Sequence, residues 1–322
     1  MRAVRVDQFG GPEVLRLVEV EDPRAAAGEV VVRLHAAGVN PVEAYIRTGQ
    51  YARLPELPYT PGGDGAGVVE ALGEGVSGMA VGDRVYVAAF LGKTGTYAER
   101  IACVARFVHP LPDGVSFGQG AALGVPAATA YRALVLRAQV KAGETVLVHG
   151  ASGAVGIAAV QLARGLGLRV FGTAGSDAGA AAAKGAGAHD MFDHSQDGYA
   201  TRITETAGAR GVNVVLEMLA NINLDRDLTL LAPRGRIVVI GSRGRIEIDP
   251  RQTMGKETAI LGTTLWSTTP EEYTQIHAAL VAALESGVLR PVVGRELPLE
   301  QAADAHRAIL TDRAVGKIVL TM

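Results

Sequence analysis

Three glycines at regular spacing are the residues of this chain whose pattern points most directly to chemistry. In VLVHGASGAVGIAAVQLA, Gly150, Gly153 and Gly156 stand between an apolar, strand-like run and a helix-like run. In such a turn one glycine allows the tight bend, a second lets the backbone approach a pyrophosphate, and a third lets the helix pack closely on the strand. The phosphates would lie at the helix N-terminus, among N–H groups without partners inside the helix. The pattern predicts a dinucleotide site.

The residues after the next strand-like run, at 168–174, bear on which dinucleotide is bound. Sites for NAD usually carry an Asp or Glu at this point, which binds the ribose diol. Here the chain reads Gly175 and Ser176. No carboxylate repels a 2′-phosphate, and the serine hydroxyl is able to donate to one, so we expect NADPH. Lys184 and His194 are the nearest basic residues that follow, and His194 fits an ordinary surface loop as well as a phosphate contact.

A catalytic metal site is not expected. Many two-domain dehydrogenases hold zinc with Cys, His and a carboxylate or second Cys. The segments where such ligands are expected, GVNPVEAY and YTPGGDGAG, offer Asn40 and Gly63, and the one cysteine, Cys103, reads as a buried apolar residue of a strand. The histidines show no paired ligand spacing except His189 and His194, which lack further ligands nearby. A quinone or a conjugated carbonyl would accept hydride without a Lewis acid, whereas alcohol oxidation would lack its usual activation.

The chain shows two different patterns of apolar residues, which predict two kinds of domain around these residues. Residues 1 to about 120 form short β-branched runs broken by Gly and Pro, which is typical of a β-rich, barrel-like domain. From about residue 124, strand-like and helix-like runs alternate, which indicates a parallel sheet with crossover helices. The strands expected there are 144–150, 168–174, 212–219, 236–242 and 257–265, and a helix is expected after each of the first two.

The last fifty residues are too few for an independent domain. A helix is expected from residue 270 to a cap at Gly287, followed by a second helix at about 299–311 and a terminal strand, GKIVLTM. We expect this tail to complete the first domain. The predicted division is therefore 1–124 plus 271–322 for one domain and 125–270 for the other.

Composition narrows the classes of partner. The 322 residues carry 31 Lys and Arg against 33 Asp and Glu, and aromatic residues make up 5%. A balanced charge without a basic stripe argues against a nucleic-acid partner. The N-terminal segment lacks the apolar core of a secretory signal, and no apolar run reaches the ~18 residues that a membrane span requires. We expect a cytoplasmic protein with a small-molecule substrate and no membrane partner.

The motifs together resemble a known family. The segments HAAGVNPVEAYIRTGQY, LPYTPGGDGAGVVEALG, VKAGETVLVHGASGAVG, EMLANINL, VIGSRG and VGKIVLTM are similar to those of zeta-crystallin and related NADPH:quinone oxidoreductases, and the similarity extends over nearly the whole chain. That family is the zinc-free branch of the medium-chain dehydrogenases and reductases. The resemblance implies an α/β fold in which a doubly wound parallel Rossmann sheet is inserted into a β-rich, GroES-like catalytic domain. It also implies a site in the cleft between the domains, reduction of quinones with ortho-quinones favoured, and a homodimer or homotetramer.

The resemblance further implies a set of cofactor contacts, which places His194 near the 2′-phosphate and makes Lys317 a candidate for the same pocket. One departure is Ala154, where relatives commonly carry Gly. Together with the glycine motif, the expected cofactor residues are Tyr45, Gly150, Ser152, Gly153, Ala154, Val155, Gly156, Gly175, Ser176, His194, Asn223, Ile240, Gly241, Ser242, Arg243, Thr263, Thr264, Leu265 and Lys317.

Three polar side chains are candidates to face the nicotinamide and the substrate: Asn40, Tyr45 and Tyr51. The Asn40 amide is able to hydrogen-bond a quinone oxygen, and Tyr45 offers an aromatic face and a hydroxyl. The alternative is an Asn that caps a helix before Pro41 and two half-buried aromatic residues.

Two other functions stay open at this point. An NADPH-dependent enoyl reductase would use the same fold and cofactor, although only Arg47 and Arg53 near the expected pocket would serve the phosphates of an acyl-CoA. A structural or RNA-binding protein that retains the cofactor is the other alternative. A salt-dependent binding assay would test RNA binding, since phosphate-driven binding falls steeply with salt.

Overall fold

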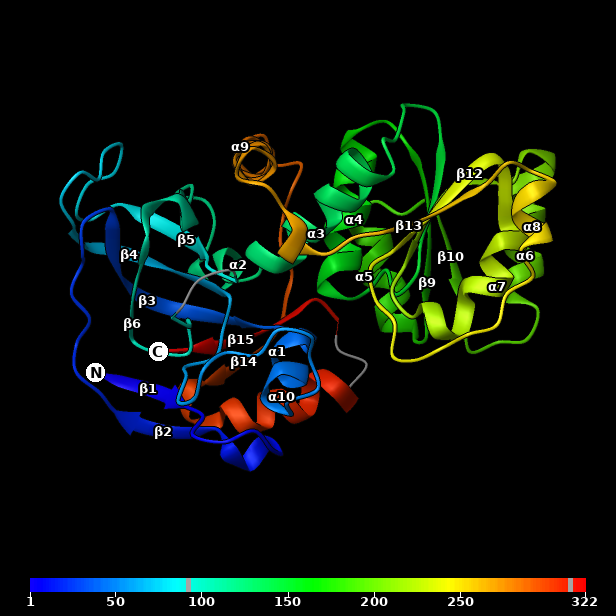
Figure 1. Cartoon of the computed structure of the whole chain (residues 1–322). Coiled ribbons are helices and arrows are strands. Elements are labelled where there is room, and N and C mark those ends of the chain that lie inside the picture. Colours follow the sequence, from blue (N-terminus) through cyan, green and yellow to red (C-terminus); the bar gives the residue numbers. More distant parts are fainter. Residues whose placement is uncertain (91–93, 312–314) are drawn as a thin grey trace. The chain divides into compact units, whose positions relative to one another are not determined.

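The computed structural model describes residues 1–90, 94–311 and 315–322, which form two compact units (Figure 1). Unit 1 comprises Met1–Pro126 and Pro291–Met322, and unit 2 comprises Ala127–Arg290. Along the chain, α3 (Gly124–Tyr131) leads from unit 1 into unit 2. The insertion of one unit into the other is therefore as the sequence predicted, with a different second boundary.

The second boundary between the compact units follows Arg290, twenty residues beyond the predicted boundary at 270. The helix expected at the start of the tail, α9 (Pro270–Glu285), belongs to unit 2. Arg132 donates to the Glu272 carboxylate at 3.1 Å, and the Gln161 side-chain amide donates to the carbonyl of Arg290 at 2.9 Å. These contacts hold the segment to unit 2, and they join residues more than a hundred positions apart, which periodicity does not reveal.

Unit 2 is built on a six-stranded, wholly parallel sheet in the order β10-β9-β8-β11-β12-β13. This is the strand order of doubly wound dinucleotide-binding domains. Successive strands are added on one side of β8 as far as β10 and then on its other side from β11 onward, and ligands bind at this switch point, beyond the carboxyl ends of the strands. The strands are β8 (Thr145–Val148), β9 (Arg169–Ala174), β10 (Asp190–Asp193), β11 (Val212–Glu217), β12 (Leu231–Val239) and β13 (Ala259–Gly262).

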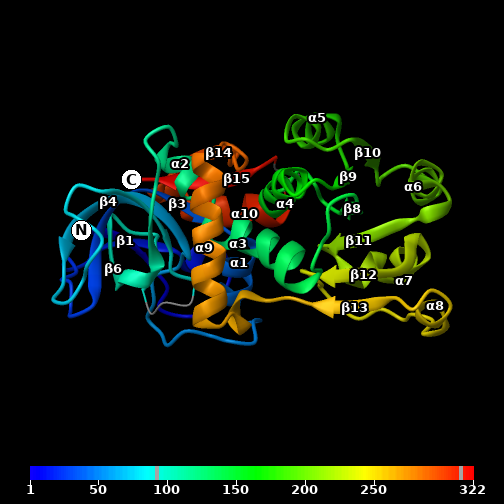
Figure 2. The same cartoon turned by 90° about the horizontal axis from the view of Figure 1, so that it is seen from above.

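Helices cover both faces of this sheet (Figures 1 and 2). Leu147, Phe171 and Val215 pack into one core with Ile203 of α6 and Leu228 of α7. Because alternate strand residues point to opposite faces, their neighbours face the other side, where α4 packs. The helices are α4 (Ala154–Gly165), α5 (Asp177–Gly185), α6 (Tyr199–Ala207), α7 (Ala220–Leu230) and α8 (Arg251–Met254), with a π-helical turn at Arg132–Arg137 and a 3₁₀ turn at Leu265–Ser267.

Unit 1 is β-rich, as expected for a GroES-like domain. Among the described residues its main sheet runs in the order β14-β15-β3-β4-β5-β7, with β6 also paired to β3, and β1 and β2 form a separate pair. The strands are β1 (Arg2–Arg5), β2 (Arg16–Glu19), β3 (Glu29–Val39), β4 (Asp64–Leu72), β5 (Arg84–Ala88), β6 (Arg100–Val104), β7 (Val108–Pro110), β14 (Val293–Pro298) and β15 (Lys317–Thr321). The helices are α1 (Pro41–Arg47), α2 (Phe117–Gly120) and α10 (Ala302–Thr311).

The C-terminal strand is part of the main sheet of unit 1. β15 pairs antiparallel with β3, and α10 packs its buried residues Ala302, Ala305 and Ala308 into the unit 1 core. The tail from residue 291 onward therefore completes unit 1, whereas the sequence placed the start of this tail at residue 271. In the part of the chain that the structure describes, no helix combines the length and the apolar character that crossing a bilayer requires.

Candidate functional site

The glycine loop between β8 and α4 has the geometry of a phosphate cradle. Gly150 adopts a φ of +58°, which suits glycine, and a Cβ on Gly156 would lie 2.3 Å from the Gly150 carbonyl oxygen. The middle glycine, Gly153, is the N-cap of α4 and supplies no side chain to the first turn. The N–H groups of that turn, which contains Ala154 and Val155, are therefore not capped by a side chain and suit an anion.

The end of β9 brings together the residues expected near a 2′-phosphate. Ser176 caps α5 by accepting a hydrogen bond from the Gly179 N–H at 3.2 Å, and its side chain is exposed. The chain passes next to this point again after β10, where the His194 N–H donates to the Ala174 carbonyl at 3.2 Å. Gly175, Ser176 and His194 thus lie at one corner of the sheet, whereas Lys184 lies in the last turn of α5, at its far end.

A third group of expected residues lines one pocket of about 450 Å³ at the ends of β12 and β13. Arg132 and Arg137 border it and give it positive character; Arg132 donates to the Thr263 hydroxyl at 2.9 Å. Leu265 begins the turn that follows. The expected residues in its wall are Ile240, Gly241, Ser242, Thr263 and Thr264.

Asn223 and Arg243 do not line this pocket, and their positions are defined by hydrogen bonds to Glu217 and Asn221. The Asn223 amide donates to Glu217 Oε1 at 3.3 Å, at the end of β11. Arg243 is exposed, and its backbone N–H donates to Asn221. The expected cofactor residues of unit 2 therefore gather at the carboxyl ends of its strands, while Tyr45 and Lys317 belong to unit 1.

Asn40 and Lys317 are members of a buried polar network in unit 1. Asn40 donates its side-chain amide to Glu43 and to Asp64, at 3.0 Å each, and its carbonyl oxygen accepts from the Lys317 ammonium. Lys317 also donates to Asp64 at 2.8 Å, and its side chain is 1% exposed. One ammonium thus lies among two carboxylates and one amide.

The network continues along one face of α1. Glu43 accepts from the Gly63 N–H at 3.0 Å and from the Tyr97 hydroxyl at 2.7 Å. Tyr97 in turn contacts His306 Nε2, and the other ring nitrogen of His306 accepts from Arg47. Burial raises the pKa of Glu43, and Lys317 opposes that rise. Burial also lowers the pKa of His306 to about 3, which keeps this imidazole neutral.

These contacts bear on the roles that the sequence suggested for Asn40 and Lys317. Both amide hydrogens of Asn40 are used inside the network, which matches the alternative of a structural Asn before Pro41 better than a donor to a quinone oxygen. The Lys317 ammonium is enclosed by Asn40 and Asp64, so it is not available to a phosphate. Sequence inspection missed this because Asn40 and Lys317 are 277 positions apart. Tyr45 and Tyr51 are each partly exposed in unit 1.

The positions where a zinc ligand was sought do not fit a zinc ion. The Asn40 amide is committed to protein groups, Gly63 has no side chain, and the Lys317 ammonium already supplies a positive charge to Asp64. Cys103 is buried in β6, where burial raises the pKa of its thiol to about 12. This agrees with its interpretation as an apolar strand residue.

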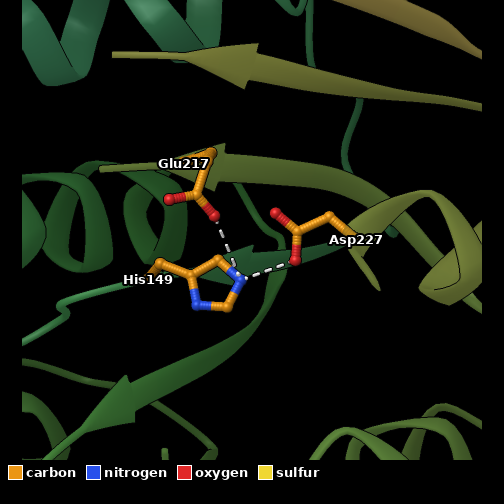
Figure 3. A group of neighbouring side chains, drawn as sticks. All are labelled: His149, Glu217 and Asp227. Carbon is orange, nitrogen blue, oxygen red and sulfur yellow. Dashed lines mark hydrogen bonds and ion pairs between the residues drawn. The ribbon is translucent and has the colours of Figure 1, made fainter. Parts of the chain in front are cut away.

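Sequence inspection missed a second buried cluster, in unit 2 (Figure 3). His149 follows β8, Glu217 ends β11 and Asp227 lies in α7; their ligand atoms lie within 4.8 Å of one another. The available signal was a polar residue at the end of each apolar run, VLVH and VVLE. Among the described residues, this is the one group of three or more His, Cys, Asp or Glu side chains close enough together to consider as metal ligands.

Comparison with known proteins agrees with this architecture. Two family models match: the alcohol dehydrogenase GroES-like domain over residues 26–113 and the zinc-binding dehydrogenase over residues 154–282. A human protein named quinone oxidoreductase is 50% identical over 324 residues, which cover 100% of this chain and 98% of that protein.

Solved structures resemble the chain over its full length. A structure of Escherichia coli quinone oxidoreductase complexed with NADPH has a TM-score of 0.88 and 31% identity, with 100% of both chains covered. A structure described as NAD-dependent alcohol dehydrogenase has a TM-score of 0.92 and 31% identity, again with 100% of both chains covered. The chain belongs to the zeta-crystallin type of quinone oxidoreductase family, within the medium-chain dehydrogenases and reductases.

Proposed function

We propose that this protein reduces quinones with NADPH, without a zinc ion. The observation that carries the proposal is full-length identity of 50% to a quinone oxidoreductase, combined with a phosphate-binding loop in unit 2 and a network without zinc ligands in unit 1. An E. coli relative was solved with NADPH. Quinones accept electrons readily without a Lewis acid, and the family resemblance implies that ortho-quinones are favoured among them.

The cofactor choice rests on the corner formed by Gly175, Ser176 and His194. No carboxylate stands at the end of β9, where an NAD site would normally place one on the ribose diol. The exposed Ser176 hydroxyl and the His194 segment would border a 2′-phosphate bound at this corner. Because the relative described as NAD-dependent shares the fold, this corner rather than the fold decides between the two cofactors.

The residues of unit 2 would hold the cofactor in three places. The first turn of α4 would receive the pyrophosphate, because no side chain caps its N–H groups and no Cβ blocks the approach at Gly153. The pocket lined by Ile240, Ser242 and Thr263 would receive the nicotinamide half. When bound, NADPH supplies the reducing electrons, and the protein orients the acceptor next to it. Tyr45 remains the candidate for an aromatic contact with substrate.

We also propose that the working form is a homodimer or homotetramer. The strand β13 lies at the edge of the unit 2 sheet and pairs on one side only, with β12. Its residues Ala259 and Ile260 are exposed in the single chain. An unpaired edge with apolar residues suits pairing with a second copy across a two-fold axis.

The test is a comparison of cofactors and acceptors on one chelator-treated preparation. With 9,10-phenanthrenequinone as acceptor, we expect rapid oxidation of NADPH, slow oxidation of NADH and no loss of rate after chelation. Crotonyl-CoA is the parallel acceptor. Turnover with crotonyl-CoA alone would replace the quinone by an enoyl substrate, and turnover with neither would make a binding function the better interpretation.

A further inference from the structure

The buried cluster of His149, Glu217 and Asp227 forms a hydrogen-bond chain with a fixed direction. His149 Nε2 lies 2.9 Å from Asp227 Oδ1 and 3.5 Å from Glu217 Oε2, so this nitrogen carries the proton that both carboxyl groups face. The other ring nitrogen lies 3.2 Å from the Thr173 hydroxyl. Burial lowers the pKa of His149, so the ring is neutral and this second nitrogen accepts from Thr173.

The two carboxyl groups leave one oxygen each without a partner. Among the described residues, Glu217 Oε2 and Asp227 Oδ2 have no hydrogen-bond donor, although both side chains are fully buried. Figure 3 shows the two carboxyl groups pointing toward each other. One proton placed between them satisfies both oxygens and removes one of two buried negative charges, either of which is costly to leave unpaired.

This cluster lies directly beneath the loops assigned to the cofactor. The Thr173 hydroxyl that faces His149 also accepts from the Gly150 N–H at 3.2 Å, at the start of the glycine loop. On the other side, Glu217 Oε1 accepts from the Leu219 N–H and from the Asn223 amide. The Glu217 carbonyl accepts from the N–H groups of Ile240 and Gly241.

We propose that His149, Glu217 and Asp227 are positioning residues that share one proton and thereby hold the cofactor-binding loops in their binding geometry. The inference rests on the proposed NADPH site and assigns a control point to it. Loss of the shared proton would place two carboxylates next to each other beneath the loops. That repulsion would shift the Thr173–Gly150 contact and the contacts of Glu217 with Leu219 and Asn223, and it would weaken NADPH binding.

The surrounding charges set where this proton is lost. Arg226 of α7 is the cation facing the cluster, and it donates to the Tyr199 hydroxyl of α6 at 2.6 Å. Burial raises the pKa of Glu217 to about 7, and its hydrogen bond with Asp227 adds to the rise. Burial likewise raises the pKa of Asp227 to about 6, and Arg226 opposes that rise. The shared proton is therefore held at acidic pH and released near neutrality.

The test compares two substitutions of Glu217. Glu217→Gln keeps an acceptor for Leu219 and gains a permanent donor toward Asp227, so it mimics the protonated cluster; Glu217→Ala removes both. We expect NADPH binding by Glu217→Gln to equal or exceed that of the wild type, with an advantage that grows about fivefold or more between about pH 6 and pH 9. Glu217→Ala is expected to bind NADPH about tenfold more weakly than the wild type at about pH 6, through KM rather than kcat, and this deficit should shrink toward pH 9 because the variant has no second carboxylate to repel Asp227. Titration of NADPH itself affects all variants equally. The ratio of each variant's NADPH dissociation constant to that of the wild type therefore reports only the effect of the cluster.

Glu144→Gln is the matched control. Glu144 pairs with Arg236 toward the amino ends of the strands of the same sheet, at the opposite end from the loops. The ratio of the NADPH dissociation constant of Glu144→Gln to that of the wild type is expected to stay constant with pH. A constant ratio for Glu217→Gln, or a pH-dependent one for Glu144→Gln, would overturn the proposal. Stoichiometric metal in the purified wild type, lost in the Glu217 variants, would replace the proton by a cation and also overturn it.

Unfolding measurements separate this inference from the proposed function. Because both carboxyl pKa values are raised on folding, the folded chain holds protons that the unfolded chain has released, and stability falls as pH rises from about 4.5 through about 7. Glu217→Gln is expected to lose much of this dependence, whether or not NADPH binds. Wild-type protein that fails to bind NADPH refutes the proposed function; wild-type protein that binds it while Glu217→Gln and Glu217→Ala behave alike refutes the positioning role.

Discussion

Single residues carry two separate proposals for this molecule: which cofactor phosphate the site accepts, and which charges the interior of the fold holds. At the end of β9 the decisive feature is a missing carboxylate next to Gly175 and Ser176. In unit 1 it is one ammonium, Lys317, enclosed with Asp64 and Glu43. Both features can be reversed by one substitution, which makes each testable alone.

Gly175→Asp is expected to reverse the preference for NADPH. The new carboxylate would stand where an NAD site binds the ribose diol and would repel a 2′-phosphate. We expect kcat/KM with NADPH to fall at least tenfold relative to NADH, or about 1.4 kcal/mol. Gly185→Asp at the far end of α5 adds the same charge where a Cβ meets nothing within 4 Å, so it serves as the control. An unchanged cofactor ratio would show that the corner does not select the cofactor.

Lys317→Met is expected to destabilise the protein strongly. Removing one partner of a buried ion pair typically costs about 3–5 kcal/mol, because the other charge stays buried without compensation. The loss should be smaller in acid, since Glu43, whose pKa is already raised by burial, then takes up a proton. Denaturant unfolding at about pH 5 and pH 8 measures both effects.

The double variant Lys317→Met/Asp64→Asn supplies the check on that interpretation. Removing the second charge should restore part of the lost stability, because Asp64 no longer needs a cation. If the double variant is as unstable as the sum of the single ones, packing rather than charge explains the loss.

At the scale of elements, two glycines of the loop between β8 and α4 are expected to have different roles, one in cofactor binding and one also in folding. A Cβ on Gly153 would meet only the Gly150 carbonyl oxygen, at 3.6 Å, whereas a Cβ on Gly156 would lie 2.3 Å from the same atom and 2.7 Å from Ala151. The first position has room in the protein alone; the second requires the backbone to move.

Gly153→Ala is therefore expected to weaken NADPH binding about tenfold or more with little change in melting temperature. Gly156→Ala should weaken binding and also destabilise the fold by about 1–3 kcal/mol, as overpacking does. Calorimetric titration and thermal unfolding of both variants are the measurements. Equal loss of stability in the two variants would contradict the assignment of Gly153 to the phosphate approach.

The same scale shows what the sequence could predict. Five of the six strands of unit 2 were expected, because apolar, β-branched runs are typical of buried parallel strands. β10 was missed because DMFD is short and half polar, and α6 and α7 because their apolar residues are few and widely spaced. The cofactor loop followed from local spacing, whereas the contacts of Lys317 and the His149 cluster depend on residues brought together by topology.

At the scale of the whole molecule, the division of labour follows the two units. Unit 2 holds the glycine loop, the phosphate corner and the proton-sharing cluster at one edge of a parallel sheet. Unit 1 holds a charge-balanced network in which an ammonium is enclosed by carboxylates. At the two positions in unit 1 where related dehydrogenases hold zinc, Asn40 is committed to Glu43 and Asp64, and Gly63 has no side chain.

Self-association is the last property of the whole molecule, and it depends on the exposed edge of β13. If two chains pair through this edge, their sheets join into one continuous sheet and Ile260, which is 38% exposed in the single chain, becomes buried. Ile260→Lys is then expected to shift sedimentation from dimer or tetramer toward smaller species, because a buried unpaired ammonium opposes association. Val81→Lys is the control, since Val81 is 65% exposed and belongs to unit 1, not to the sheet that contains β13. Wild-type protein that sediments only as a monomer would contradict the oligomer, and an oligomer that Ile260→Lys leaves intact would assign the interface to another surface.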